Sequence, residues 1–145
     1  MNRKWMVWAA LVAAQGAHAE GRLGVFDAWI RAAPPGATMM AGYATLKNEG
    51  DESLTLLTVQ SDAFRMTAMH ETIVVEGVAK MRDVHRIVLE PGQEVRLQPG
   101  GRHLMLMQPR RQVAIGENVE IRFLLSDGRR IDTHFEVLAP DAASD

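Results

Sequence analysis

The 145-residue chain predicts a single all-β domain, an antiparallel β-sandwich or barrel. Its predicted strands are short and are separated by Gly, Pro, Asn and Asp, as is typical of sandwiches and barrels. No helical periodicity persists for three turns anywhere in the chain. The segment 20–138 is long enough to bury a core without disulfides, and the chain contains no cysteine.

Nine strands are expected between these turns. In chain order they are Val25–Ala32, Met40–Lys47, Leu54–Val59, Met66–Val75, Val78–Val84, Glu94–Leu97, His103–Gln108, Asn118–Leu125 and Arg130–Leu138. Gly adopts positive φ freely and Pro presets φ for a turn, so the clearest breaks are the Gly- and Pro-containing segments. They are Pro34-Pro35-Gly36, Asn48-Glu49-Gly50, Pro91-Gly92, Pro99-Gly100-Gly101 and Ser126-Asp127-Gly128.

The N-terminus is typical of an exported protein. Arg3-Lys4 precedes an apolar run from Trp5 to Ala14, and Ala17-His18-Ala19 has the small-x-small form of a signal-peptidase site. The ten-residue apolar run is well short of the roughly 20 residues that span a bilayer. We therefore expect residues 1–19 to be a cleaved signal peptide and the protein to be periplasmic without stable membrane insertion, with an uncleaved anchor as the alternative.

The charge of the expected mature chain excludes some partners. Removal of residues 1–19 takes away two basic residues and leaves 14 Lys and Arg against 18 Asp and Glu. A net charge near −4 gives no indication of a nucleic-acid partner. We expect a monomeric domain over residues 20–138, followed by a short polar tail at 139–145.

Four residues form a candidate metal site: His70, Met81, His103 and Met105, separated by ten, twenty-one and one intervening residues. Two imidazoles alone would suit zinc, Cu(II), nickel or iron, whereas thioethers select a soft ion, and Cu(I) fits best. Met and His also avoid the disulfide oxidation that threatens a thiolate site in an oxidising compartment. The ligand set therefore predicts copper, as Cu(I).

The expected strands bring these four residues together as two pairs. Side chains alternate along a strand, so His103, Met105 and Met107 should share one face while Leu104 and Leu106 point into the core. The preceding Pro-Gly-Gly turn would place His103 at the start of its strand, at an accessible rim. A four-residue hairpin loop would put His70 directly opposite Met81, and a two-residue loop would make them a diagonal pair.

The spacing H-x10-M-x21-H-x-M resembles that of the periplasmic copper chaperones called PCu(A)C. The resemblance extends from about residue 24 to residue 138 of the mature chain. It is carried by Asp27-Ala28-Trp29-Ile30-Arg31-Ala32, the Pro-Pro-Gly turn, Tyr43, Asn48-Glu49-Gly50, His70-Glu71-Thr72, Lys80-Met81-Arg82 and Pro99-Gly100-Gly101-Arg102-His103-Leu104-Met105-Leu106-Met107.

The resemblance implies a cupredoxin-like sandwich that binds Cu(I) through His70, Met81, His103 and Met105. It also implies delivery of copper to the CuA site of cytochrome c oxidase subunit II, with other copper-assembly proteins as further possible partners. Some relatives carry Met directly after the first His, where this chain has Glu71, with Met69 just before it. The His- and Met-rich extension of other relatives is missing from the tail, so a second, tail-based copper site is not expected.

The remaining candidates have simpler interpretations. We expect Met39, Met40 and Met66 to be packing or surface residues, and His85 and His134 to be ordinary exposed or hydrogen-bonded histidines. Met107 shares the ligand face and is an alternative or auxiliary ligand. The basic residues that could rim the site are taken as a solvated face, with docking to an acidic partner as the alternative; they are Arg65, Lys80, Arg82, Arg102, Arg110 and Arg111.

Enzymatic functions are not expected. There is no Cys for nucleophilic attack or for a blue-copper centre, no Gly-rich phosphate loop, and no nucleophile-elbow context around a serine. The sequence therefore predicts a periplasmic Cu(I) chaperone. A copper-sequestering protein that buffers the metal without delivering it is the alternative, and a metal-free β-sandwich is a third possibility.

Overall fold

The computed structural model describes residues 21–142 as an all-β domain. Its ten strands are β1 (Leu23–Arg31), β2 (Met39–Asn48), β3 (Leu54–Gln60), β4 (Phe64–Val75), β5 (Val78–Asp83), β6 (Ile87–Leu89), β7 (Glu94–Leu97), β8 (Arg102–Pro109), β9 (Asn118–Leu125) and β10 (Arg130–Leu138). All nine predicted strands are present with ends shifted by two residues or fewer. The expected signal peptide, 1–19, lies outside the described residues.

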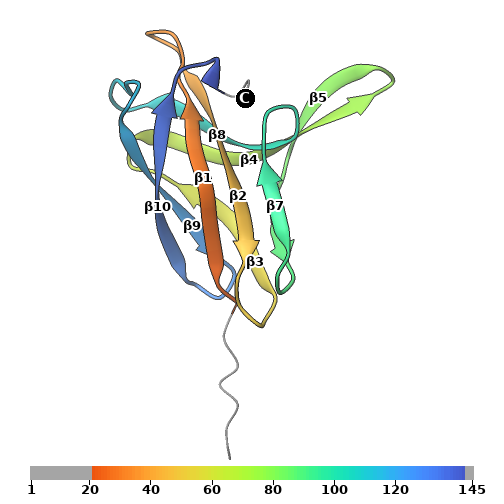
Figure 1. The fold of residues 1–145 in the computed structure, drawn as a ribbon. Helices are drawn as coiled ribbons and strands as arrows, with labels where there is room; N and C mark the ends of the chain where they lie inside the picture. Colours follow the sequence, from red (N-terminus) through yellow and green to blue (C-terminus); the bar gives the residue numbers. More distant parts are fainter. Residues whose placement is uncertain (1–20, 143–145) are drawn as a thin grey trace, which may run out of the picture.

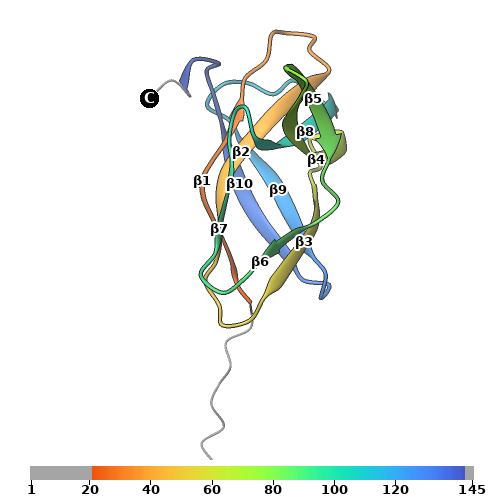
Figure 2. The same cartoon turned by 90° about the vertical axis from the view of Figure 1, so that its right-hand side faces the viewer.

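The strands form one continuous sheet in the order β5-β4-β8-β7-β2-β1-β10-β9-β3-β6, with an additional pairing of β8 with β2. The sheet curls into two layers around a core, as the two views show (Figures 1 and 2). Most pairings are antiparallel, as predicted, but β1 pairs with β10 and β7 pairs with β8 in parallel. The sheet is therefore mixed: β1 and β10 come from opposite ends of the described chain, whereas β7 and β8 are joined by residues 98–101 and share the single pair Leu97 and Arg102.

The core consists of apolar side chains from alternating positions of the strands. Phe123 and Phe135 are fully buried with their rings 6.2 Å apart, and Leu104 and Leu106 of β8 are also fully buried. At roughly 25 cal/mol per Å² of apolar area, burial of such side chains is the main stabilising contribution. The core thus lies behind β8, on the face opposite the candidate ligands.

Asn48 explains the turn predicted at Asn48-Glu49-Gly50. Its side chain is fully buried, donates to the backbone carbonyls of Glu52 and Leu89, and accepts from the backbone N–H groups of Arg22 and Gly50. A buried amide is costly unless it is paired, and this one is paired at both ends. It holds β6 against the turn, and β6 is the one strand that the sequence did not predict.

The β4–β5 hairpin extends away from the body of the domain (Figure 1). All six residues of β5 are exposed, and β5 is an edge strand of the sheet.

Trp29 and Tyr43 pack against each other with ring centroids 4.8 Å apart, and the Arg31 guanidinium lies within 6 Å of both rings. Trp29 and Arg31 therefore serve packing against Tyr43. Within residues 21–142, no helix is long and apolar enough to cross a bilayer.

Candidate metal centre

Strands β4 and β8 place the two predicted imidazoles directly opposite each other. His70 pairs with His103 in the antiparallel register, and their ring centroids lie 6.0 Å apart in an edge-to-face arrangement at 81°. Met105 lies two residues along β8 on the same face, opposite Ala68 of β4. Three of the four predicted ligands therefore share one patch of the sheet, and the shared face of His103 and Met105 is the one that alternation along β8 predicted.

The fourth residue, Met81, is brought to the patch by the β4–β5 hairpin. Val75 pairs with Val78, so the loop contains only Glu76 and Gly77, with φ of 51° and 77°. Positive φ at both central residues is the signature of a type I′ turn, whose twist matches that of the strands. Met81 consequently lies opposite Thr72 and diagonal to His70, so the direct-pair alternative is wrong and the diagonal one is correct.

Each imidazole uses one ring nitrogen for a protein partner. His103 Nδ1 lies 3.1 Å from the carbonyl of Gly101, and His70 Nε2 lies 2.9 Å from a carboxylate oxygen of Asp83. Both partners accept a hydrogen bond, which assigns the N–H to His103 Nδ1 and His70 Nε2 in the neutral rings. Metal-binding histidines commonly donate their other ring N–H to a carboxylate or a backbone carbonyl in this way.

The other two ring nitrogens have no partner. His70 Nδ1 and His103 Nε2 are buried and make no hydrogen bond in the structure. An unsatisfied buried polar atom costs about 1–3 kcal/mol, so its presence in a folded domain requires an explanation. A metal ion bound between the two rings would accept both lone pairs, and the residues present therefore fit a soft metal ion.

The burial of the ligands differs from the expected exposed rim. His103 is 5% exposed and Met105 is 9% exposed, although His103 is only the second residue of β8. Met81, in contrast, is 61% exposed on the edge strand. The expectation that His103 leaves the ion at the surface is wrong, because His103 and Met105 are both buried although their side chains lie on the face opposite Leu104 and Leu106. Access to the site lies on the Met81 side.

An ion-pair cluster lies on the other face of the same strands, where Glu71 is paired with Arg82 of β5 and Arg102 of β8. Glu71, next to His70, accepts two hydrogen bonds from the Arg82 guanidinium at 2.8 and 3.0 Å, and Arg102 lies 3.6 Å from its other carboxylate oxygen. The hydrogen bonds from Arg82 hold the pKa of the Glu71 carboxyl below its usual value. Arg111 pairs with Glu117 at another edge. Half of the predicted basic rim is thus neutralised by carboxylates, which supports the solvated-face interpretation.

The structure also places the other Met and His residues that the sequence offered as candidates. Met69 is 3% exposed on the core face opposite Leu104, so its side chain is directed away from the ligand face. Met40 is buried, and His85 and His134 are exposed. Met107 does share the ligand face, with Met39 and Met66 beside it. Of these, only the three methionines of that face stay candidates for metal binding.

Sequence reasoning missed Asp83 and the Gly101 carbonyl, which orient the two imidazoles. Asp83 lies two residues after Met81, so strand alternation could have placed it on the same face. Among residues 21–142 there is no cluster of three or more His, Cys, Asp or Glu that could hold a metal. The candidate site therefore depends on methionine sulfur as well as on histidine.

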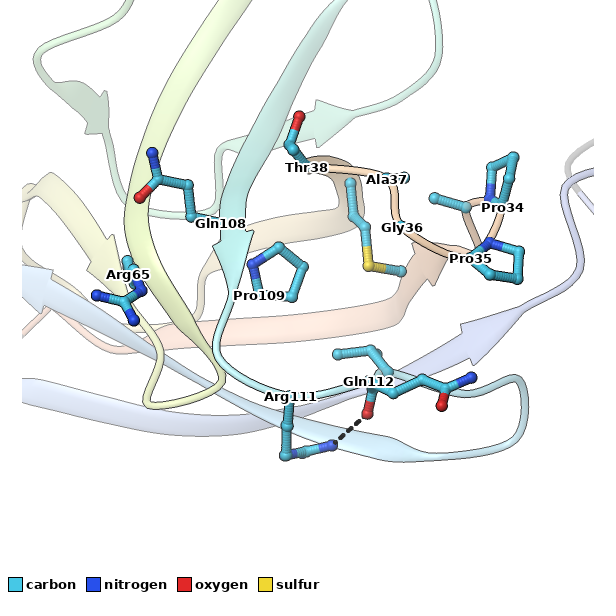
Figure 3. Close-up of a pocket in the computed structure, with 13 residues that line it drawn as sticks. Pro34, Pro35, Gly36, Ala37, Thr38, Arg65, Gln108, Pro109, Arg111 and Gln112 are labelled. Atoms are coloured by element: carbon cyan, nitrogen blue, oxygen red, sulfur yellow. Dashed lines mark hydrogen bonds between the residues drawn. The ribbon is translucent and has the colours of Figure 1, made fainter.

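A groove of about 680 Å³ lies elsewhere, beside the Pro34-Pro35-Gly36 turn (Figure 3). Arg65, Gln108 and Arg111 line its opposite side, and none of the four candidate ligands contributes to it. The candidate metal centre is accordingly not a cavity but a patch on paired strands.

A family model and two related proteins match this chain. A family model described as "putative lipoprotein LpqE-like" matches residues 23–137. The chain is 31% identical over 114 residues to the putative lipoprotein Lxx21020 of Leifsonia xyli subsp. xyli, covering 78% of this chain and 67% of that protein. It is 35% identical over 88 residues to the uncharacterized protein RP573 of Rickettsia prowazekii, covering 60% of this chain and about half (49%) of that protein.

Solved structures agree with the family model. The solution structure of CuI-DR1885 from Deinococcus radiodurans is 28% identical with a TM-score of 0.67, covering 92% of this chain and 89% of that one. The apo PmoF2 PCuAC domain is 26% identical with a TM-score of 0.68, covering 85% and 94%. The chain belongs to the PCu(A)C family. The predicted resemblance and the cupredoxin-like β fold are thereby confirmed.

PCu(A)C domains are copper-binding domains of the chaperone type, a non-enzymatic kind of protein. The copper-bound PmoF2 domain, 24% identical, shares the fold with a TM-score of 0.68, covering 83% of this chain and 95% of that one. CuI-DR1885, at 28% identity, confirms copper as the metal of this class of domain, in agreement with the sequence.

Proposed function

We propose that this protein is a periplasmic Cu(I) metallochaperone that binds its cargo through His70, Met81, His103 and Met105. The observation that carries the proposal is the pair of buried, unpartnered nitrogens, His70 Nδ1 and His103 Nε2, on directly paired strands. Met105 on β8 and Met81 on β5 supply sulfur on the same face. The four side chains are neutral ligands, two imidazoles and two thioethers, which suit Cu(I).

The choice of Cu(I) over zinc follows from what surrounds the imidazoles. Protein zinc sites are completed by Cys, His or carboxylate ligands. Asp83, whose carboxylate lies 2.9 Å from His70 Nε2, is already engaged as a hydrogen-bond acceptor. The remaining donors on the face are thioethers, which bind harder ions poorly. Purified protein should therefore bind one Cu(I) far more tightly than Zn(II), and equal or tighter zinc binding would contradict the proposed Cu(I) function.

The neutral ligand set also suits release. Without thiolates the site does not cancel the charge of the ion, so a dithiolate acceptor should hold Cu(I) more tightly. Met81 is exposed on an edge strand and is the ligand that an incoming thiolate can replace first, while both imidazoles and Met105 still hold the ion. We propose the CuA site of cytochrome c oxidase subunit II as that acceptor.

Transfer kinetics test the delivery. Cu(I)-loaded protein is mixed with a reduced CuA-site fragment, and transfer is compared with loss to a trap that does not contact the protein. Transfer to the fragment faster than unassisted loss supports delivery. Tight Cu(I) binding with transfer no faster than that loss would favour the alternative, a copper-sequestering protein.

The names of the family model and of the Leifsonia relative, both putative lipoproteins, support export to the cell envelope. We propose a periplasmic protein whose mature chain begins at Glu20. N-terminal sequencing of protein recovered from the periplasmic fraction tests this. Protein that retains residues 1–19 in the membrane fraction would instead support the uncleaved anchor.

A further inference from the structure

Three methionines form a row across the outer face of the sheet, next to the proposed site. Met39 of β2 and Met66 of β4 both pair with Met107 of β8. Directly opposed residues of an antiparallel pair have Cα atoms about 4.5–5.5 Å apart and their side chains on one face. The flexible thioether side chains can therefore converge over the central residue, Met107.

The row is continuous with the proposed site. The next row toward the imidazoles is Ala41, Met105 and Ala68, and His103 and His70 lie in the row after it. Successive rows on one face are two residues apart, which is about 6.6–6.8 Å along a strand. Met105 therefore stands between the methionine row and the two imidazoles, with an alanine opposite it on each side.

Packing does not account for this row. Met39 is 56% exposed and Met66 is 54% exposed, while the core on the other face of the same strands is filled by Met40 and Leu106. Exposed methionine is open to oxidation to the sulfoxide, a cost that Leu at the same positions would not carry. What Met offers and Leu lacks is the thioether sulfur, a ligand for soft metal ions.

The residues around the row also disfavour hard cations. Arg65, Thr38 and Gln108 alternate with Met66, Met39 and Met107 along the chain, so they point to the other face, where they line the groove shown in Figure 3. On the face of the row itself, the adjacent positions are Ala41, Met105 and Ala68, which bring no carboxylate. A site of this composition would select a soft, singly charged ion.

We propose that Met39, Met66 and Met107 form a second, weaker Cu(I) site, from which the ion passes through Met105 to His70 and His103. The ion remains Cu(I) throughout, because the passage exchanges neutral ligands and transfers no electron. The onward passage rests on the proposed chaperone function; binding to the three thioethers does not. An all-thioether site holds the ion less tightly than one with imidazoles, so copper moves toward the buried pair.

The test uses Cu(I) supplied from a chromophoric chelator, together with NMR of the methionine methyl groups. The mature protein should bind a first Cu(I) tightly and a second weakly, and the second should shift the methyl signals of Met39, Met66 and Met107. A triple variant, Met39→Leu, Met66→Leu and Met107→Leu, should lose the weak equivalent, keep the tight one and load it more slowly. Met→Leu conserves volume, so the fold should survive.

Met40→Leu is the matched control, because Met40 adjoins Met39 in sequence but is buried on the opposite face. It should retain both equivalents. Loss of the weak equivalent in Met40→Leu, its retention in the triple variant, or methyl shifts elsewhere would each overturn the proposal.

Failure of the chaperone function has a different signature. If His70→Ala with His103→Ala leaves all Cu(I) binding unchanged while the triple Leu variant abolishes it, the imidazole site is wrong and the methionine site stands. If the histidine variant loses the tight equivalent and the triple variant behaves as the parent, the methionine site is wrong and the chaperone site stands.

Discussion

The two halves of the proposed copper site differ in how firmly the fold holds them. His103 and Met105 lie on β8, which is paired on both sides and has Leu104 and Leu106 fully buried behind it. Met81 lies on β5, an edge strand with six exposed residues at the end of a projecting hairpin (Figure 1). The buried half is preorganised for binding, and the exposed half is free to exchange.

This contrast assigns affinity and release to different strands. Preorganised ligands lose little conformational entropy when the metal binds, so they contribute most of the affinity. An exposed side chain on an edge strand is ordered at a greater entropic cost and is reached more easily by an acceptor. Substitutions on β8 should therefore change stability or affinity strongly, and those on β5 should change exchange.

The largest expected effect separates the two faces of β8. Leu104→Ala should lower the free energy of unfolding by about 2–5 kcal/mol, as truncations of buried Leu do. It should leave Cu(I) affinity unchanged wherever the variant is folded, because Leu104 points away from the ligands. Urea denaturation and Cu(I) titration at low temperature measure the two quantities. A stable variant with weakened copper binding would show that the faces are inverted.

His103→Ala should reverse this pattern. It removes a buried ligand nitrogen, so Cu(I) affinity should fall by more than about 100-fold, the upper limit seen for residues that only orient a ligand. Competition with a chromophoric chelator measures the loss. His85→Ala, at an exposed histidine outside the site, is the matched control and should keep the parental affinity. Equal affinities for the two variants would remove His103 from the ligand set.

Met81→Leu should have a smaller effect on affinity and a larger effect on exchange. We expect Cu(I) affinity to fall about tenfold to thirtyfold, or about 1.4–2 kcal/mol, because Met81 contributes from an exposed edge. Spontaneous loss of Cu(I) should accelerate. Val78→Leu, at an exposed residue of the same strand outside both proposed sites, is the control for a changed apolar side chain on β5. A loss of affinity as large as that of His103→Ala would contradict the contrast between the halves.

Asp83→Ala tests whether the exposed strand orients the buried imidazole. Removal of the acceptor of His70 Nε2 should lower Cu(I) affinity about tenfold, the lower end for such partners, because solvent can replace a carboxylate on an exposed strand. Asp83→Asn retains an acceptor oxygen and should lose less. If both variants bind as the parent does, the 2.9 Å contact does not tune the ligand.

The sequence predicted the strands and the shared face of His103 and Met105, because strand alternation and turn residues are local properties. That His70 lies opposite His103 depends on the pairing of β4 with β8, which is distant in sequence, so only the resemblance implied it. It did not predict β6, since three residues between polar segments carry too little pattern. It left the hairpin register open, although positive φ at Glu76-Gly77 in the structure selects the two-residue turn. The sequence also did not predict that His103 and Met105 are buried, because burial depends on strands that are distant in sequence.

The smallest expected effect concerns the ion pair that ties β5 to β4. Glu71 accepts hydrogen bonds from Arg82 across the hairpin, and this interaction holds its pKa below the usual value of 4.5. A carboxyl whose pKa is lowered in the folded state stabilises that state above its unfolded pKa, and the contribution disappears as the pH falls through the folded value. Glu71→Gln should therefore lower Tm slightly at pH 7, and the difference from the parent should narrow below pH 4.5 and close when Glu71 is protonated. Exposed ion pairs are also screened, so added salt should shrink the difference at pH 7. Thermal unfolding at several pH values and salt concentrations measures this, with Glu76→Gln at the hairpin turn as the control for loss of a charge. A difference that grows on acidification would show that Glu71 does not act through this ion pair.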